Sequence, residues 1–451
     1  MIFANSESTA TLNGLVLTND DNTLIDKDGR GTKGSVLCEY QGTFVVDNCT
    51  FNAVYDYLVY IKSSDLNNYH QFTNCTFNCN GKRPIHSKTN LKVDNCTFND
   101  QYRYSVQLRG QGKNADRSEV IFTNNKIVDA CKTSGKPFAV GLEITANQPF
   151  ANVYVLVQNN TEGLNYTYVS KVNGVANAFE PSWDSCEIVG AAFVDEEKVV
   201  SYGLLGYKDA NEIQNYEVSN ANGLATLNAM MADKTAGRDV VVNLTADIDF
   251  TGKTWTMVDS HADTAFEIAE INGNSHTISN LTINGQAMFK RFAGSGDVTI
   301  KNVTFDNATV NSNGTINTSI LTAHSYQNVL LDNVDVKNSS ITGGYKVAPL
   351  IATVYNESSS TVTATLKNCD VENVTVKSTS YDFCTTGMVA FVYASDNDKI
   401  EFENCTVKNV KLIAPNDSYK AHAAIYTTGS GTLFNEAEGV TVTNVTFEEL
   451  K

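Results

Sequence analysis

The chain has 451 residues and a net charge of −17, and 42% of its residues are hydrophobic and 10% aromatic. This length exceeds what one ordinary core holds, so we expect two domains or one elongated repeat. The apolar content excludes a disordered chain, the 29 glycines and six prolines exclude a collagen-like one, and the negative charge argues against a nucleic-acid partner.

The chain begins without an export signal. Residues 1–14 lack the basic and apolar regions of a signal peptide, and no run of 18 apolar residues occurs that could form a transmembrane segment. The first repeat starts almost at once, in LNGLVL (12–17), so we expect an N-terminally truncated chain whose true start lies upstream.

A six-residue phrase recurs along the chain: an apolar residue, any residue, Asn, any residue, usually Thr or Asp, and a second apolar residue. Its central asparagines stand at 48, 74, 95 and 124, and then at 280, 302, 333, 368, 404 and 444. Spacings of 21 to 40 residues indicate a solenoid with loop insertions. The flanking apolar residues alternate as in short strands, and Asn tolerates the left-handed bend between two strands. The phrase predicts an all-β fold, a right-handed parallel β-helix, with the six later asparagines in one line.

In the second half another asparagine follows five residues after the first. These asparagines, at 307, 338, 373 and 409, predict a second column of bends. Charged residues flank the first column before it, at Lys301, Asp332, Lys367 and Glu403, and after it, at Asp306, Lys337, Glu372, Lys408 and Glu448. Both sets alternate in sign, and neighbouring strands lie about 4.8 Å apart, so we expect each charge to face an opposite one.

Cysteines share one position of the phrase. Five of the ten follow its asparagine, at 49, 75, 96, 369 and 405, and none forms a CxxC pair typical of a zinc site. We expect these thiols to be buried, stacked and reduced, as small hydrophobic side chains.

The repeat pattern divides the chain into two tandem β-helical domains. We expect the first over 1–162 and a connector of undefined structure over 163–219, where the phrase is lost. The second, over 220–451, begins with one short capping helix at 220–237, for which Asn222 is the expected cap and Gly237 the expected end. Leu224, Leu227 and Met231 would share its buried face.

With these residues in view, the chain resembles the pectate-lyase-like right-handed parallel β-helix superfamily. Residues 216–451 are similar to Bacteroidetes-type surface β-helix proteins, in YEVSNANGLATLNAMM, LTADIDF and INGNSHTISNLTI. APLIATVY (348–355) and TGMVAFVY (386–393) look like degraded GLUG repeats. Such proteins are commonly described as adhesins, and the superfamily also contains polysaccharide lyases, so the resemblance implies fold more firmly than activity.

The strands after the bends are where such a fold would hold a site. In the second domain these strands, in TSILTA (318–323), PLIATV (349–354), MVAFVY (388–393) and AAIYTT (423–428), are nearly free of charge. Asp335 and Asp370 are equivalent residues of adjacent rungs, and form either a weak cation site or two solvated acids near Lys337.

The first domain differs, because its corresponding strands carry cations. Lys62, Lys88 and Arg109 take one outward position on consecutive rungs, and Tyr60, His86 and Gln107 take the outward position before them. Tyr57, Arg83 and Tyr104 lie nearby. Stacked like charges are unfavourable unless an anion binds, and Arg and Tyr suit carboxylates and sugar rings. The alternative is long side chains that extend into solvent or pair with loop acids.

The leading hypothesis is a non-catalytic, monomeric β-helix protein, extracellular or at the cell surface, that acts as an adhesin or glycan-binding scaffold for an acidic polysaccharide. No cofactor is expected. One alternative is a polysaccharide lyase or glycoside hydrolase that uses the first domain's face, with a lyase taking Lys or Arg as base and Tyr as proton donor. Another is a trimeric fibre similar to a phage tail spike.

Overall fold

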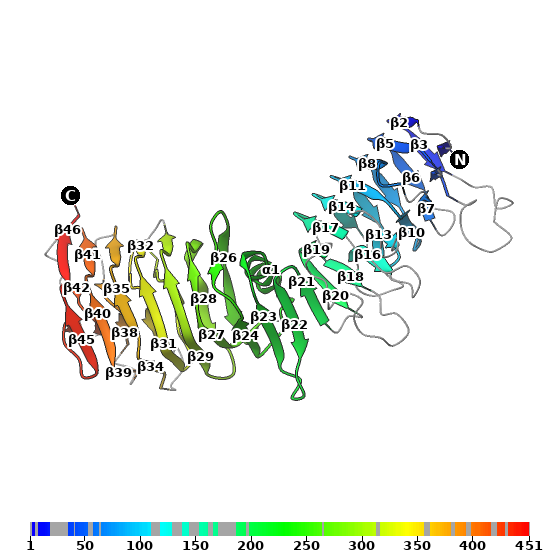
Figure 1. Cartoon of the computed structure of the whole chain (residues 1–451). Coiled ribbons are helices and arrows are strands. Elements are labelled where there is room, and N and C mark those ends of the chain that lie inside the picture. Colours follow the sequence, from blue (N-terminus) through cyan, green and yellow to red (C-terminus); the bar gives the residue numbers. More distant parts are fainter. Residues whose placement is uncertain are drawn as a thin grey trace. The chain divides into compact units, whose positions relative to one another are not determined.

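The computed structural model describes residues 2–4, 8–18, 35–39, 41–52, 57–62, 65–109, 118–128, 138–143, 153–160, 166–169, 186–194, 198–263, 266–312, 316–355, 361–379, 384–393, 398–415, 422–428 and 432–450. Each of two compact units, Met1–Tyr202 and Gly203–Lys451, is a stack of short strands (Figure 1). In both units the stack is a right-handed parallel β-helix, as the repeat predicts.

Unit 1 has three sheets, and the turns of the chain from β2 to β16 add one strand to each. The first sheet contains β2 (Thr9–Asn13), β5 (Thr43–Asp47), β8 (Tyr69–Thr73), β11 (Asn90–Asp94), β14 (Ser118–Thr123), β17 (Val153–Gln158) and β19 (Cys186–Val189). The second contains β3 (Val16–Thr18), β6 (Thr50–Asn52), β9 (Thr76–Asn78), β12 (Thr97–Asn99) and β15 (Lys126–Val128). The third contains β1 (Ile2–Ala4), β4 (Leu37–Glu39), β7 (Tyr57–Ile61), β10 (Arg83–Ser87), β13 (Tyr104–Arg109), β16 (Phe138–Glu143), β18 (Tyr166–Val169) and β20 (Ala191–Val194), with β21 (Lys198–Ser201) antiparallel to β20.

Unit 2 repeats this plan, and its strands β26 to β29 and β31 are longer than those of unit 1. Its first sheet contains β23 (Gln214–Val218), β24 (Val240–Leu244), β25 (Ile248–Asp249), β27 (Ile268–Ser279), β29 (Val298–Asp306), β31 (Val329–Lys337), β34 (Thr363–Lys367), β35 (Asp370–Glu372), β39 (Lys399–Glu403), β40 (Cys405–Lys408) and β45 (Val440–Thr443), and β22 (Leu204–Lys208) is antiparallel to β23. The second contains β26 (Thr254–His261), β28 (Thr282–Ala293), β30 (Thr309–Asn311), β32 (Ser340–Gly343), β36 (Thr375–Ser378), β41 (Lys411–Ala414) and β46 (Thr446–Glu449). The third contains β33 (Ile351–Val354), β38 (Val389–Val392), β43 (Tyr426–Thr428) and β44 (Leu433–Phe434), beside the pair β37 (Thr385–Thr386) and β42 (His422–Ala423).

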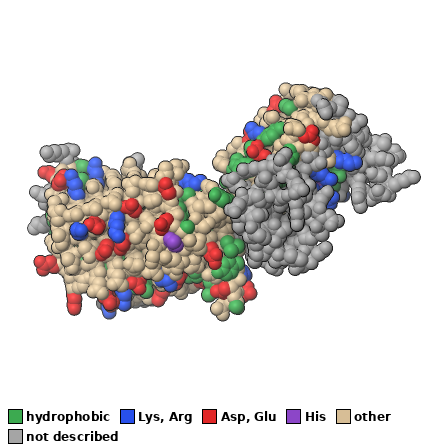
Figure 2. Space-filling view, in the orientation of Figure 1, with side chains coloured by type: hydrophobic (Ala, Val, Ile, Leu, Met, Phe, Trp, Pro, Cys, Tyr) green, Lys and Arg blue, Asp and Glu red, His purple; other side chains and the backbone are tan. Residues whose placement is uncertain are grey.

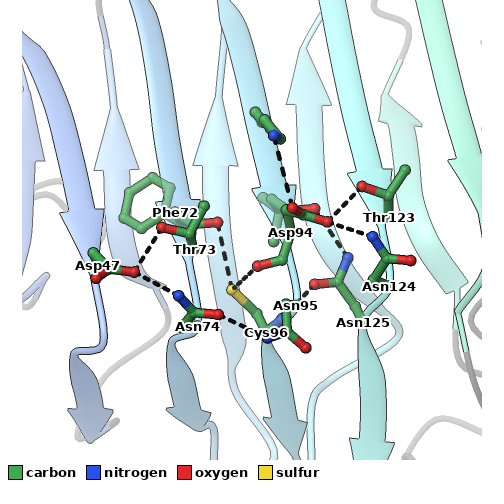
Figure 3. Close-up of polar contacts among 12 residues, drawn as sticks. Asp47, Phe72, Thr73, Asn74, Asp94, Asn95, Cys96, Thr123, Asn124 and Asn125 are labelled. Carbon is green, nitrogen blue, oxygen red and sulfur yellow. Dashed lines mark hydrogen bonds and ion pairs between the residues drawn. The ribbon is translucent and has the colours of Figure 1, made fainter.

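Asparagines in the left-handed conformation join the strands. Asn48, Asn74 and Asn95 have φ of 51°, 53° and 53°, and Gly14 takes the same place in the first rung with φ of 66°. The side chains form a ladder, in which Asn95 Nδ2 donates to Asn74 Oδ1 at 2.7 Å. Asn74 in turn donates to Asp47 at 2.7 Å, and Thr73 donates to the same carboxylate oxygen at 2.9 Å (Figure 3). Each bend is therefore bonded to the next along the solenoid axis.

Unit 2 has two asparagine columns, and the prediction of one line for six asparagines is wrong at its two ends. The first column holds Asn302, Asn333, Asn368 and Asn404, as the register of β29, β31, β34 and β39 requires. Asn280 and Asn444 belong to the second column, because Asn307 donates to Asn280 at 2.6 Å and Asn444 donates to Asn409 at 2.8 Å. Those two phrases contain a single asparagine, which does not reveal the bend it occupies.

The charge columns have the predicted register. Lys301 faces Asp332, Asp332 faces Lys367, and Lys367 faces Glu403. The second column runs through Asp306, Lys337, Glu372 and Lys408. Acidic and basic side chains are accordingly interspersed on the visible face of unit 2 (Figure 2).

Some charged residues of these columns form an ion pair with a residue other than the one they face. Lys367 contacts Glu403 at 3.1 Å and Lys408 contacts Glu372 at 2.7 Å. Lys301 instead contacts Glu270 at 2.8 Å. Glu448 was wrongly assigned to the second column, since Lys408 faces Thr443, and Glu448 pairs with Lys411 at 2.7 Å in the second sheet.

The cysteines after the asparagines are buried and free, as predicted, and they also form hydrogen bonds. The Cys96 thiol donates to the Asp94 carbonyl at 3.3 Å, and its sulfur accepts from the Cys75 backbone N–H at 3.4 Å. In the next rung Asn125 Oδ1 accepts from the Cys96 N–H at 2.8 Å (Figure 3 shows both residues). Cys and Asn therefore share this column because both present an acceptor inside the bend.

Stacked aromatic side chains fill the core of unit 1. Phe51, Phe77 and Phe98 have no exposed surface, and their rings lie parallel with centroids 4.8 and 4.9 Å apart. This distance equals the strand spacing, so one residue type at one repeat position generates a continuous apolar stack.

One helix, α1 (Ala221–Ala232), precedes the first rungs of unit 2. Its buried face contains Leu224, Leu227 and Met231, as predicted. The cap is Asn220 and not Asn222, because extended Asn220 accepts the Gly223 N–H at 3.0 Å, and the helix ends at Asp233, before Gly237. In the part of the chain that is described, no helix is long and apolar enough to cross a membrane.

Strands also occur in the segment 163–219, whose structure the sequence left undefined. β18 and β20 continue the third sheet of unit 1 and β19 continues its first sheet, all in parallel register. The limit between the two units, at 202 and 203, falls within this segment.

The asparagine bends can be tested at Asn95. Alanine at this position would have to adopt the same left-handed conformation, which costs an ordinary residue about 1–2 kcal/mol. It would also lose the hydrogen bond to Asn74. We expect Asn95→Ala to lower the free energy of unfolding by about that amount in urea denaturation. Asn95→Gly, which matches Gly14, should cost less; equal losses in both variants would contradict a conformational role.

Candidate functional site

The candidate residues of unit 1 are aligned by the third sheet as predicted. Tyr60 of β7 faces His86 of β10, and His86 faces Gln107 of β13. Lys62 and Lys88 follow these positions, and Arg109 is in register with the backbone of Glu143 in β16. The register therefore places Lys62, Lys88 and Arg109 side by side on three consecutive rungs.

Most of the candidate side chains on this face are buried or half-buried, although the sequence predicted that they point outward into solvent. His86 and Gln107 are only 2% and 1% exposed, and Tyr57 and Tyr104 are also buried. Tyr60, Lys88 and Arg109 are half-buried, and Lys62 is exposed. The expectation of a solvent-exposed His86 is therefore wrong, since strand alternation gives the side of the sheet and not what covers it.

Aromatic rings account for part of this cover. The Tyr60 and His86 rings are parallel, with centroids 4.4 Å apart and an interplanar angle of 8°. The Tyr57 ring meets His86 edge-on at 5.3 Å. In the next rungs Gly141 leaves space for the Tyr104 ring, because a Cβ there would lie 2.5 Å from a ring carbon of Tyr104.

Hydrogen bonds connect the polar members of the site. Arg83 Nη1 donates to the Tyr57 hydroxyl at 2.6 Å, and that hydroxyl donates to Gln107 Oε1. The Arg83 guanidinium also lies over the Tyr57 and Tyr102 rings, 5.4 and 5.5 Å from their centroids. Tyr57 is thereby fixed between a cation and an amide.

The cations of the column act on the ionisable groups between them. Burial, and then the charges of Arg109 and Lys88, lower the pKa of His86 to about 3, so its ring is neutral at pH 7. Burial, followed by Arg109 and Lys62, also lowers the pKa of Lys88. His86 Nδ1 has no hydrogen-bond partner within the described ranges. Such a surface favours a carboxylate or sulfate over a cation.

No metal centre is evident in the described residues, where no three His, Cys, Asp or Glu side chains converge. Asp335 and Asp370 do lie on adjacent rungs. One Asp335 oxygen accepts from Lys337 Nζ at 2.8 Å and the other accepts from the Asp370 N–H at 3.2 Å. These contacts favour the ion pair over a cation site.

The sequence did not identify Tyr168 as part of this face. Its ring lies under the Arg103 guanidinium, 4.2 Å from the centroid, and stacks with Tyr104 at 6.4 Å. Tyr168 faces Gly141, one rung beyond the last recognised strand. The only sequence signal was an alternating YTYV in a segment without the asparagine phrase.

Comparisons with known proteins support the fold. A family model for a right-handed β-helix region matches residues 13–180. No curated protein matches the chain. Among solved structures, the chain is similar to a crystal structure of a proposed immunoglobulin A1 protease from Bacteroides ovatus, with 16% identity, 53% of this chain and 76% of that chain covered, and a TM-score of 0.30. A TM-score of this size carries no argument about function.

Buried His86 predicts an acid sensitivity. Its pKa of about 3 lies below the ordinary value of 6.5, so the unfolded chain binds a proton below pH 6.5 while the folded chain does not. The stability that His86 contributes is therefore present above pH 6.5 and is lost as pH falls toward 3. Urea denaturation at pH 7 and pH 5 should show a smaller pH effect in His86→Gln than in wild type. If the pH effect on stability is the same in His86→Gln and wild type, His86 is not buried as the structure shows.

Proposed function

We propose that the third sheet of unit 1 binds an acidic glycan, and that the protein is an adhesin or glycan-binding scaffold outside the cell or at its surface. The observation that carries this proposal is the strand register, which places Lys88 between Lys62 and Arg109 on consecutive rungs. Burial and then these two charges lower the pKa of Lys88. An anion bound here would relieve the repulsion between the three cations and so would be stabilised by it.

The neighbouring groups suit a sugar acid. Arg109 offers a planar guanidinium that matches a carboxylate or sulfate, and Lys62 is exposed at the edge of the same column. The half-buried Tyr60 ring, held by its stack on His86, offers an apolar surface for a pyranose ring. The pectate-lyase-like resemblance of the sequence points to the same ligand class.

Charge recognition is tested by titrating the protein with tetragalacturonate in a calorimeter. Wild type should bind with an affinity that falls as salt rises, because exposed charges are screened over about 8 Å at physiological ionic strength. Lys88→Ala with Arg109→Ala should lose one bound tetramer per chain and leave the melting temperature nearly unchanged.

A matched control removes two cations from other faces of unit 1. Lys92 lies in β11 and Lys126 in β15, so Lys92→Ala with Lys126→Ala changes the net charge equally and should bind as wild type does. If Lys88→Ala with Arg109→Ala binds as many tetramers as wild type, the column is ordinary surface. Unsaturated products that absorb in the ultraviolet would instead identify a lyase.

A further inference from the structure

A column of tyrosines lies on the third sheet of unit 2. Tyr326, Tyr355 and Tyr393 follow Ser325, Val354 and Val392, which are in register on consecutive rungs. The ring centroids are 6.1 Å apart between Tyr326 and Tyr355, and 4.3 Å apart between Tyr355 and Tyr393. All three residues are half-buried.

A buried lysine stands beside this column. Lys346 is 4% exposed, its Nζ lies 3.7 Å from the Phe391 ring centroid and 4.7 Å from that of Tyr393, and it donates to the Tyr393 hydroxyl at 3.3 Å. Burial lowers its pKa to about 8, which leaves it mostly protonated at pH 7. No described carboxylate lies within ion-pair distance of it. The aromatic faces compensate only part of the cost of burying this charge.

A second polar group in the same place is incompletely bonded. Asn317 is 8% exposed, and its Nδ2 donates to Thr353 Oγ1 at 2.9 Å. Its Oδ1 has no partner among the residues described, although a buried amide oxygen ordinarily accepts a hydrogen bond. Thr318 is in register with Val347 and its N–H donates to the Lys346 carbonyl at 2.8 Å, so Asn317 and Lys346 lie side by side on adjacent rungs.

The other basic side chains near the tyrosine column differ from Lys346, because each is neutral or contacts a carboxylate. Arg291 is neutralised by Asp259, to which it donates two hydrogen bonds at 2.8 and 3.1 Å, and Lys290 lies 3.8 Å from the same carboxylate. His324, stacked on Tyr326, has its pKa lowered to about 4 by burial and then by Lys346, and is neutral at pH 7. Among the described cations beside the column, Lys346 is the one without a carboxylate within ion-pair distance.

We propose that the tyrosine column, Lys346 and Asn317 form a second glycan site, on unit 2, that takes an acidic pyranose. The sugar carboxylate pairs with the Lys346 ammonium, the ring packs on Tyr355 and Tyr393, and a hydroxyl donates to Asn317 Oδ1. Strands repeat about every 4.8 Å. Successive sugars of an extended chain advance by nearly this distance, so the glycan runs along the solenoid axis. This site is independent of the unit 1 face.

The experiment isolates unit 2 by starting from the protein with Lys88→Ala and Arg109→Ala. Calorimetric titration with tetragalacturonate should still show one bound tetramer. Adding Lys346→Met should weaken this binding by about tenfold or more, the usual effect of losing a charge-assisted hydrogen bond. Adding Lys411→Met, which removes a half-buried lysine of β41 that pairs with Glu448, should leave it unchanged.

Stability and ligand chemistry complete the test. Lys346→Met should not lower the melting temperature, because an apolar side chain of similar volume replaces a buried charge. Tyr355→Leu, which keeps Lys346, should weaken binding of the tetramer as well. The fully methyl-esterified tetramer, which has no charge, should bind the protein with Lys88→Ala and Arg109→Ala about tenfold more weakly than the free acid, or worse.

Different results would contradict the two proposed glycan sites. If Lys88→Ala with Arg109→Ala already abolishes all binding, the unit 2 site is wrong and the unit 1 proposal stands. If wild type binds one tetramer that only Lys346→Met removes, the unit 1 proposal is wrong. Equal binding of the tetramer and its methyl ester, or undiminished binding by Lys346→Met, would contradict the role of the ammonium.

Discussion

The solenoid depends on a residue that bends the backbone to positive φ and bonds a side chain of the neighbouring rung. Asparagine does both: its φ lies between 50° and 58° at Asn333, Asn338 and Asn373. Its Nδ2 donates either to the equivalent asparagine, as from Asn373 to Asn338, or to the aspartate before that asparagine, as from Asn338 to Asp306. A hydrophobic residue would lose the bond and carry the strain. Because the bends of successive rungs lie at the same position, loops of different length can be inserted between strands without changing the strand register.

Coincident bends turn each repeat position into a column along the axis. Inside unit 1 this produces the phenylalanine stack and the mixed column of Cys96 and Asn125. Outside unit 2 it produces the charge columns, where Lys367 and Glu403 alternate in sign. Two columns outside the core do not alternate: the cations around Lys88 in unit 1 and the tyrosines around Tyr355 in unit 2. Both proposed glycan sites lie there.

The sequence predicted the features that recur in every rung and missed those that occur in one rung alone. The asparagine phrase was sufficient for fold, register and buried cysteines, since each follows from position within one rung. It misplaced Asn280 and Asn444 because one asparagine cannot identify which of two bends it makes. It did not predict the burial of His86 and Gln107, because alternation along a strand says nothing of covering groups. Lys346 was overlooked for a similar reason, although the repeated ending of APLIATVY and TGMVAFVY held the signal for Tyr355 and Tyr393.

Cross-linking tests most directly whether the asparagine bends bring equivalent residues together. Asp332 and Lys367 face each other on adjacent strands, within the Cα separation of about 4.4–6.8 Å that a disulfide spans. Cysteines at both positions should form an intrachain disulfide under mild oxidation. Cysteines at Lys301 and Lys367, two rungs apart, should not. A disulfide in the second pair and none in the first would contradict the register on which the whole structure rests.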